Sequence, residues 1–261
     1  MAENSKIQWT DHTVNFWTGC KKVSDGCKYC YMYRDKERYG KDPTEVVKVN
    51  AKTINKVLKE AKPGDKIFTC SWSDFFIKEA DEWRKEAWDI IRDNPQFEWQ
   101  ILTKRPERIK ECLPDDWGDG WKQVWLGVSV ENSKSLKRVS VLTDLNNGAA
   151  NFKTFISFEP LIGDVFDAPL DVDDSLSLSM IDWVIVGGES GNDNGAYLYR
   201  PCQIEWMNAI IKPFQDNGTP VFVKQLGTHL SKQLGLSDRH GGDINEFPIS
   251  LQIREFPQGI R

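Results

Sequence analysis

Strand signals recur at an even spacing along most of this chain, and that spacing limits the folds open to it. An apolar run at Val14–Trp17 is followed by six more, 25 to 38 residues apart, which begin at Lys66, Glu98, Gln123, Lys153, Asp182 and Pro220. Each interval fits one strand and one helix. Alternating strands and helices imply a parallel sheet. The pattern predicts an α/β protein with a full or partial (β/α) barrel, TIM-like, and leaves an open doubly wound sheet as the alternative.

Helical patterns fill several of the intervals between these runs. We expect helices over residues 44–59, 79–92, 132–145 and 201–218. The stretch 161–180 is rich in Asp and Ser and shows no clear helix. No domain boundary is visible, so we expect residues 1–261 to form a single domain, with residues 227–261 as a loop-rich C-terminal appendage.

Composition narrows the class of protein further. The chain has 261 residues, 28% of them charged, and a formal net charge of -5. This charge disfavours a broad basic surface that coats nucleic acid without regard to sequence. The N-terminus shows no signal peptide, and no stretch approaches the roughly 18 apolar residues of a membrane span. We therefore expect a cytoplasmic protein that does not contact a membrane.

Three of the six cysteines stand close together in the chain. Cys20, Cys27 and Cys30 share one short loop, whereas the others, Cys70, Cys112 and Cys202, are scattered in apolar surroundings that fit buried thiols. In a reducing cytoplasm, disulfides are not expected. Three thiolates on one loop can hold three corners of an iron–sulfur cluster or three positions of a metal site, and they leave one coordination position open.

A zinc site is the first alternative for these cysteines. Structural zinc takes four ligands, and only His12 among the three histidines is near in sequence. A Cys3His zinc site would make the chain a zinc-stabilised binding protein, for example an accessory to a phage or defence system. A [4Fe–4S] cluster fits the three cysteines better. A cluster protein that only transfers electrons is a further alternative.

The cysteine loop resembles the cluster loop of the radical S-adenosylmethionine (radical SAM) superfamily. It reads Trp17-Thr-Gly-Cys20, six residues, then Cys27-Lys-Tyr29-Cys30, with a first gap of six rather than the usual three. More narrowly, the chain is similar to a phage and bacterial family of radical-SAM-like proteins of unassigned reaction. The matching blocks include Ser73-Asp74-Phe75-Phe76, Gln100 to Arg108, Trp125 to Asn132, Phe158-Glu159-Pro160-Leu161, Gly187 to Gly191, Phe222-Val-Lys224-Gln225 and His240-Gly-Gly-Asp243.

The resemblance implies a cofactor set and a reaction type. Cys20, Cys27 and Cys30 would bind a [4Fe–4S] cluster, and SAM would chelate its unique iron. An electron from a reductant such as flavodoxin or ferredoxin would then cleave SAM to a 5′-deoxyadenosyl radical that attacks a substrate. The likeness to phage proteins and the Lys104-Arg105 pair favour a nucleotide or nucleic acid, for repair or base modification. The acidity of the whole chain argues against it.

Candidate contacts for cofactor and substrate lie where the predicted strands end, since barrel enzymes place their chemistry at the carboxyl ends of the strands. Those for SAM are Tyr29, Ser71, Ser73, Asp74, Ser129, Glu131, Asn132, Gly187 and Gly188. Those for substrate are Lys104, Arg105, Glu159, Glu189, Lys224 and Gln225. Each has a simpler alternative: a helix cap for Asn132, a tight turn for the glycine pair, and solvated surface charge for Lys104-Arg105. No catalytic residue is assigned.

Overall fold

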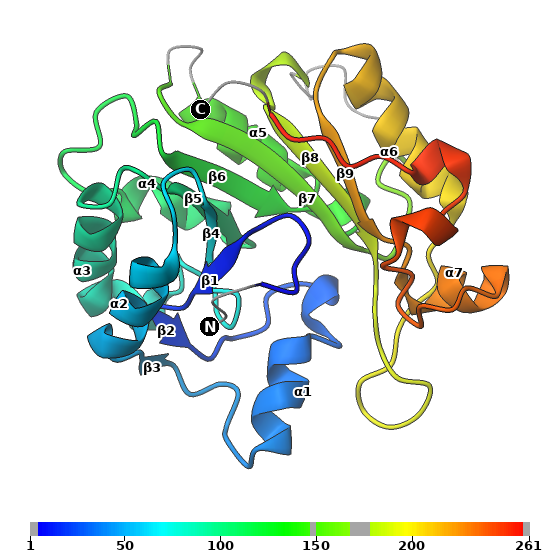
Figure 1. Ribbon diagram of the computed structural model, residues 1–261, viewed down its shortest axis with the longest axis horizontal. Coiled ribbons are helices and arrows are strands. Elements are labelled where there is room, and N and C mark those ends of the chain that lie inside the picture. The colour runs from blue at the N-terminus through cyan, green and yellow to red at the C-terminus, as the bar shows by residue number, and fades with distance from the viewer. Residues whose placement is uncertain (1–4, 147–149, 168–177, 258–261) are drawn as a thin grey trace.

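The computed structural model describes residues 5–146, 150–167 and 178–257, and its main feature is a curled parallel sheet (Figure 1). Seven strands form this half-barrel: β1 (His12–Val14), β4 (Lys66–Thr69), β5 (Glu98–Thr103), β6 (Val124–Ser129), β7 (Lys153–Leu161), β8 (Trp183–Gly188) and β9 (Val221–Gln225). They lie side by side in chain order, so the order never reverses. A doubly wound sheet requires such a reversal, and that alternative is therefore excluded. The barrel is partial, because β1 and β9 are separate edges of the described sheet.

Helices cover the convex face of this sheet. They are α2 (Ala51–Glu60), α3 (Asp81–Arg92), α4 (Ile109–Cys112), α5 (Lys137–Leu145) and α6 (Ile204–Asp216). Their buried faces, which include Trp88, Leu142 and Phe214, form one core with outward-facing strand residues such as Val128. Two helices lie elsewhere: α1 (Tyr31–Arg38) follows the cysteine loop, and α7 (Gly227–Leu234) follows β9 (Figure 1). Short 3-10 turns occupy Asp25–Cys27, Lys78–Ala80, Pro106–Arg108, Ser133–Ser135, Leu178–Met180, Ile244–Glu246 and Ile249–Leu251.

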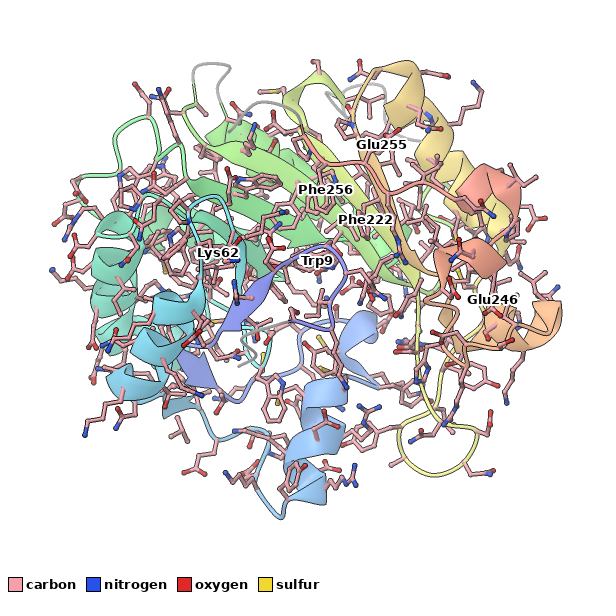
Figure 2. The ribbon with its side chains drawn as sticks, viewed as in Figure 1. Trp9, Lys62, Phe222, Glu246, Glu255 and Phe256 are labelled. Atoms are coloured by element: carbon pink, nitrogen blue, oxygen red, sulfur yellow. The ribbon has the colours of Figure 1, made fainter. Side chains whose placement is uncertain are left out.

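Aromatic side chains fill the concave face near the amino ends of the strands. Trp9 from the N-terminal segment joins a second buried cluster with Phe68, Trp125, Phe155, Trp183 and Phe222. Figure 2 shows Trp9, Phe222 and Phe256 gathered in front of the sheet. Because side chains alternate along a strand, the next concave positions after Trp125 in β6 are Gly127 and Ser129. The half-barrel thus has an aromatic floor and a mouth lined by small and polar residues.

Most of the predicted strands are confirmed, but the N-terminal units differ. The run Val14–Trp17 is not one strand, because the chain leaves the sheet after Val14 and β2 (Trp17–Thr18) pairs with β3 (Val47–Lys48) in a small antiparallel sheet. That pairing also delays the helix predicted from residue 44, which begins only at Ala51 after Asn50 caps it. The helix predicted from residue 201 begins at Ile204. Of the predicted irregular stretch, residues 168–177 lie outside the described residues.

The C-terminal segment is part of the fold, and the predicted appendage is not confirmed. The amide of Val223 in β9 donates to the carbonyl of Ile253 at 2.8 Å, and the amide of Glu255 donates to Val221 at 2.9 Å. This contact covers the free edge of β9, which would otherwise expose unpaired backbone groups. Phe247 and Leu251 are buried in the main core. Among the described residues, no helix combines the length and apolarity needed to cross a bilayer.

Candidate functional site

The cysteine loop, residues 19–30, lies across the carboxyl ends of the strands. After β4, the carbonyl of Trp72 accepts a hydrogen bond from the amide of Gly19 at 2.9 Å. After β5, the guanidinium of Arg105 donates to the carbonyl of Lys21 at 2.7 Å. These contacts anchor the first half of the loop to two neighbouring strands.

The second half of the loop is held by the ends of β6 and β8. The hydroxyl of Ser24 donates to the carboxylate of Glu131, which follows β6, at 2.8 Å. The guanidinium of Arg200 donates to the carbonyl of Asp25 at 2.8 Å and is itself bound by Glu189, which follows β8. Strand ends that are far apart in sequence therefore meet on one loop, as parallel strands in a single sheet allow.

Asp74 joins the strand ends beneath the loop. One carboxylate oxygen accepts from the amide of Phe76 at 2.9 Å and from the hydroxyl of Thr103 at 2.8 Å. The other accepts from the amide of Lys104 and pairs with the guanidinium of Arg105, both at 3.0 Å. Both side chains of the ion pair are more than 90% buried. Asp74 thus positions the cation that holds the cysteine loop.

The other predicted contacts after β4 have internal partners as well. The hydroxyl of Ser73 donates to the carbonyl of Gly19 at 2.5 Å. The hydroxyl of Ser71 accepts from the side-chain Nδ2 of Asn15 at 3.2 Å. Cys70 directs the chain into this segment from a left-handed conformation, with φ of 52°. Ser73 and Asp74 therefore brace the cysteine loop in this structure, whereas the Ser71 side chain contacts Asn15 before it. A contact from any of the three to the amino group of SAM stays a prediction.

The three thiols act on one another electrostatically. Burial raises the pKa of Cys20 to about 12, with a further rise from Asp74, while Arg105, 3.7 Å from the sulfur, works in the opposite direction. Burial also raises the pKa of Cys30, and the nearby cation of Lys104 works against that rise. Coulombic repulsion from Cys27 adds to both shifts. The raised pKa values keep the thiols of Cys20 and Cys30 protonated at neutral pH.

The cysteine site takes no histidine from His12. The His12 ring lies 2.9 Å from the carboxylate of Asp65, at the amino end of β1, whereas the cysteines follow its carboxyl end. This arrangement gives no support to a Cys3His site that includes His12, and that alternative stays a prediction. Within residues 5–146, 150–167 and 178–257, no group of three or more His, Cys, Asp or Glu side chains is close enough to hold a metal ion. A set of three thiols beside Lys104 and Arg105 has the donor chemistry that an iron–sulfur cluster requires.

Glu131 is the acidic partner of the loop at the end of β6. It is 1% exposed and pairs with Lys104 at 3.3 Å and with Arg138 at 2.9 Å. Burial works to raise its pKa, but these two cations and the Ser24 hydroxyl hold the pKa below its usual value. A methyl group on Gly26 would come within 2.4 Å of Glu131, so the loop packs tightly there. These partners leave Glu131 little freedom to bind a ribose hydroxyl.

Two further predicted ribose contacts, Ser129 at the end of β6 and Asn132 after it, have different roles in the structure. Asn132 completes a capping box with Ser135, which confirms its alternative as a helix cap. Ser129 is buried and takes its place on the concave face by alternation with Trp125. Of the predicted ribose contacts, Ser129 is the one placed toward the mouth.

The far side of the mouth is formed by β7, β8 and β9. Glu159 and Lys224 form an ion pair there, and Gln225 donates to the carbonyl of Gly188 at 2.8 Å. A Cβ atom on Gly187 would make ordinary contacts at 3.4 Å to Glu159 and 3.5 Å to Gln225. A Cβ atom on Gly188 would lie 2.2 Å from the carbonyl oxygen of Leu226. Gly188 is therefore needed for chain packing, and Gly187 is the glycine that faces the polar side chains of the mouth.

Three residues of the site were missed by sequence reasoning. Arg200 binds Glu189 through its amide at 2.9 Å and its Nε at 2.8 Å, and its guanidinium lies 5.3 Å from the ring centre of Tyr29. The hydroxyls of Tyr31 and Tyr33 donate to the carbonyls of Ser71 and Cys20, each at 2.5 Å. No local pattern marks Arg200. The two tyrosines directly follow the cysteine motif, and this position could have been used to predict that they belong to the site.

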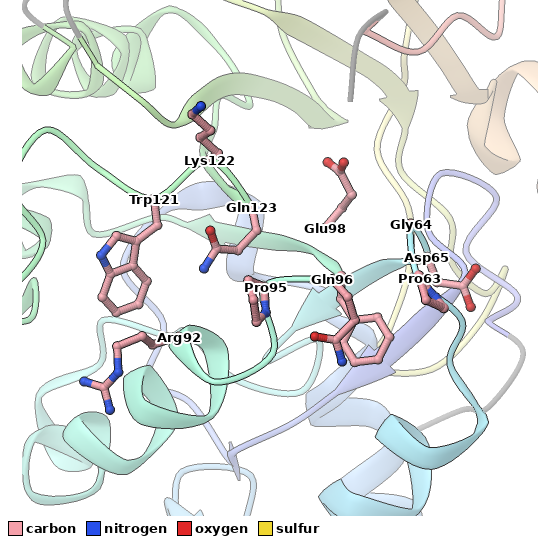
Figure 3. A pocket seen from close by; sticks show the side chains of 11 residues that line it. Pro63, Gly64, Asp65, Arg92, Pro95, Gln96, Glu98, Trp121, Lys122 and Gln123 are labelled. Atoms are coloured by element: carbon pink, nitrogen blue, oxygen red, sulfur yellow. The ribbon is translucent and has the colours of Figure 1, made fainter. Parts of the chain in front are cut away.

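A separate hollow of about 950 Å³ opens at the opposite end of the strands (Figure 3). Asp65, Glu98 and Gln123, which line it, stand at the starts of β4, β5 and β6. Arg92 and Trp121 form another part of its wall. In barrel folds this end serves stability, whereas chemistry occurs at the carboxyl ends. We therefore keep the cysteine loop, and not this hollow, as the candidate functional site.

Comparisons with known proteins assign a family but no reaction. Neither the curated proteins nor the solved structures give a match to this chain. One family model, described as protein of unknown function (DUF5131), matches residues 4–249. Because the match covers nearly the whole chain, cysteine loop and strand ends included, this protein belongs to the DUF5131 family.

Proposed function

We propose that this protein is a radical SAM enzyme whose [4Fe–4S] cluster is held by Cys20, Cys27 and Cys30. The observation that carries the proposal is the placement of the three-cysteine loop across the carboxyl ends of a curled parallel sheet, held there by β4, β5, β6 and β8. In barrel enzymes that end is where reactive groups from several strands converge. When bound, such a cluster supplies the electron that cleaves SAM to a 5′-deoxyadenosyl radical.

The chain's own groups prepare the site for a negatively charged cluster. Arg105 and Lys104 place positive charge beside the thiols, and this favours their deprotonated form. Tyr33 holds the backbone of Cys20 through its hydroxyl. The aromatic side chains around Phe155 and Trp183 fill the half of the concave face beneath the mouth. Bound molecules would therefore occupy the polar half. These groups orient the ligands and limit the space that water can enter.

Within this proposal, the residues assigned to the cofactor are fewer than the sequence analysis listed. Ser129 and Gly187 face the mouth, and we retain them as contacts for SAM. Glu159 and Lys224 stay candidates for substrate, together with Gln225. Arg105 and Glu189 are engaged with the cysteine loop, directly or through Arg200, and we assign them to positioning. A flavodoxin or ferredoxin remains the proposed electron donor.

Anaerobic purification tests the proposal. The protein should contain about four iron and four sulfide per chain, as a [4Fe–4S] site requires. After reduction with dithionite it should convert SAM to 5′-deoxyadenosine, measured by chromatography. A colourless protein with zinc in place of iron would overturn the proposal. A loaded cluster that is reduced but produces no 5′-deoxyadenosine would show an electron-transfer protein instead.

The two glycines at the end of β8 provide a matched pair of variants. Gly187→Ala should leave stability within about 0.5 kcal/mol, because a methyl group there meets only ordinary contacts. It should nevertheless raise the KM for SAM if the cofactor approaches the backbone at this point. Gly188→Ala should lower stability by about 1–3 kcal/mol, since its methyl group would overlap the Leu226 carbonyl. Thermal unfolding and SAM titration of both variants separate the roles, and an unchanged KM in Gly187→Ala would remove that residue from the cofactor site.

A further inference from the structure

The tyrosines of this chain are concentrated around the cysteine loop. All six occur in two short segments: four at positions 29, 31, 33 and 39, and two at positions 197 and 199. The fold brings the segments together. Burial and then the carboxylate of Glu37 on α1 raise the pKa of Tyr197, and Arg200 lies over the Tyr29 ring at 5.3 Å. Tyr29 on the cysteine loop therefore lies beside the segment that carries Tyr197 and Tyr199.

Positive charge is concentrated in the same place. Residues 19–41 contain seven Lys and Arg but three Asp and Glu, although the whole chain carries a net charge of -5. Lys22 lies 4.5 Å from the ring centre of Tyr33, and Lys28 lies 5.0 Å from that of Tyr29. Both lysines are exposed, and neither forms an ion pair with a described residue. Their charges are available to a ligand.

Tyr31 follows the last cysteine of the loop and contacts the segment after β4. Its hydroxyl is fixed on the Ser71 carbonyl after β4, and the charge of Glu159 in β7 reaches it electrostatically. The side chain is nevertheless 43% exposed. A partly exposed ring that is held by its hydroxyl loses little rotamer freedom when a flat group stacks on it.

We propose that this tyrosine rim, defined as Lys22, Lys28, Tyr29 and Tyr31, binds single-stranded nucleic acid. Bases stack on the rings and phosphates pair with the two lysines, which is how single strands are bound when sequence is not read. Duplexes fit poorly, because paired bases cannot stack on side chains and because the rest of the chain is acidic. This inference deepens the proposed function. It rests on that function in one respect: a base stacked on Tyr31 would face the reactive centre.

Fluorescence anisotropy with a labelled oligothymidylate of about 12 nucleotides tests this proposal, since one single-strand site covers about 4–16 nucleotides. The full chain, purified without oxygen, should bind it more tightly than a duplex of equal length. Tyr31→Leu should weaken binding about 5- to 160-fold, the range expected for the loss of one stacked base. Tyr31→Phe retains the ring and should restore binding. Lys22→Gln with Lys28→Gln should lower the salt slope by about 1.4, from two lost phosphate contacts.

Matched controls distinguish the rim from a general surface effect. Tyr39 is 69% exposed at the C-terminal end of α1, and Lys59 is exposed on α2. Tyr39→Leu and Lys59→Gln should change the affinity by less than about twofold. Equal losses from Tyr39→Leu and Tyr31→Leu, equal affinity for duplex, or no oligonucleotide binding at low salt would each overturn the proposal. Oligonucleotide binding is measured without turnover, so the two proposals can fail separately. A protein that cleaves SAM but binds no oligonucleotide would contradict only the rim proposal. A protein that binds the oligonucleotide but carries no cluster after purification without oxygen would contradict only the proposed enzyme.

Discussion

Replacement of Cys20, Cys27 or Cys30 with alanine should abolish the iron–sulfur absorbance of protein prepared without oxygen. In the proposed site each cysteine supplies one of three thiolates, and each lies on the loop that spans the strand ends. A cubane held at two corners loses the geometry on which its retention depends, so iron content and 5′-deoxyadenosine formation should fall together. Absorbance spectroscopy, iron analysis and product chromatography measure the three effects.

The other cysteines supply the control for this experiment. Cys112 and Cys202 are buried within the hydrophobic core, away from the cysteine loop. Alanine at either position should leave the absorbance intact and lower stability modestly, by about 1 kcal/mol. If all five variants keep the cluster, or all five lose it, the ligand assignment is wrong.

Asp74→Ala should be the most destabilising single change at the mouth. It removes four contacts and leaves the guanidinium of Arg105 buried without its carboxylate partner. Removal of one partner from a buried ion pair costs about 3–5 kcal/mol. At about 2–4 °C per kcal/mol for a chain of this size, Tm should fall by roughly 6–20 °C. Thermal unfolding followed by circular dichroism checks this result.

An exposed ion pair provides the comparison. Asp216 pairs with Lys212 at 2.7 Å on α6, and both side chains are largely exposed. Asp216→Ala should therefore cost about 0.5 kcal/mol or less. If Asp74→Ala kept the wild-type Tm but lost affinity for SAM, the brace role would be wrong and the predicted contact to the SAM amino group would stand.

The repeating units were predictable because they depend on local patterns. The apolar runs that begin at Lys66, Glu98 and Lys153 are buried strands in the structure, and the helix expected over residues 79–92 is α3 with a 3-10 turn before it. The errors arose where a distant segment took part. Val14–Trp17 is divided because Trp17 pairs with Lys48, and the C-terminal segment is integral because it covers the edge of β9.

The same limit applies to the candidate site. Lys104 and Arg105 read as a free cationic pair, but in the fold each meets a buried acid, Glu131 and Asp74 respectively. Arg200 carries no local signal, and its role depends on Glu189 and on Asp25, 175 residues away. A sequence shows which charges exist but not which of them neutralise each other.

The sequence alone determined the alternation of strands and helices, the three clustered thiols and the polar strand ends, because each depends on neighbours within a few residues. The tertiary structure alone decided that the half-barrel does not close, that the acids after β4, β6 and β8 are engaged with the loop, and that Arg200 lies over the Tyr29 ring. These features depend on contacts between segments tens of residues apart, whose partners are selected only when the sheet curls and its carboxyl ends converge.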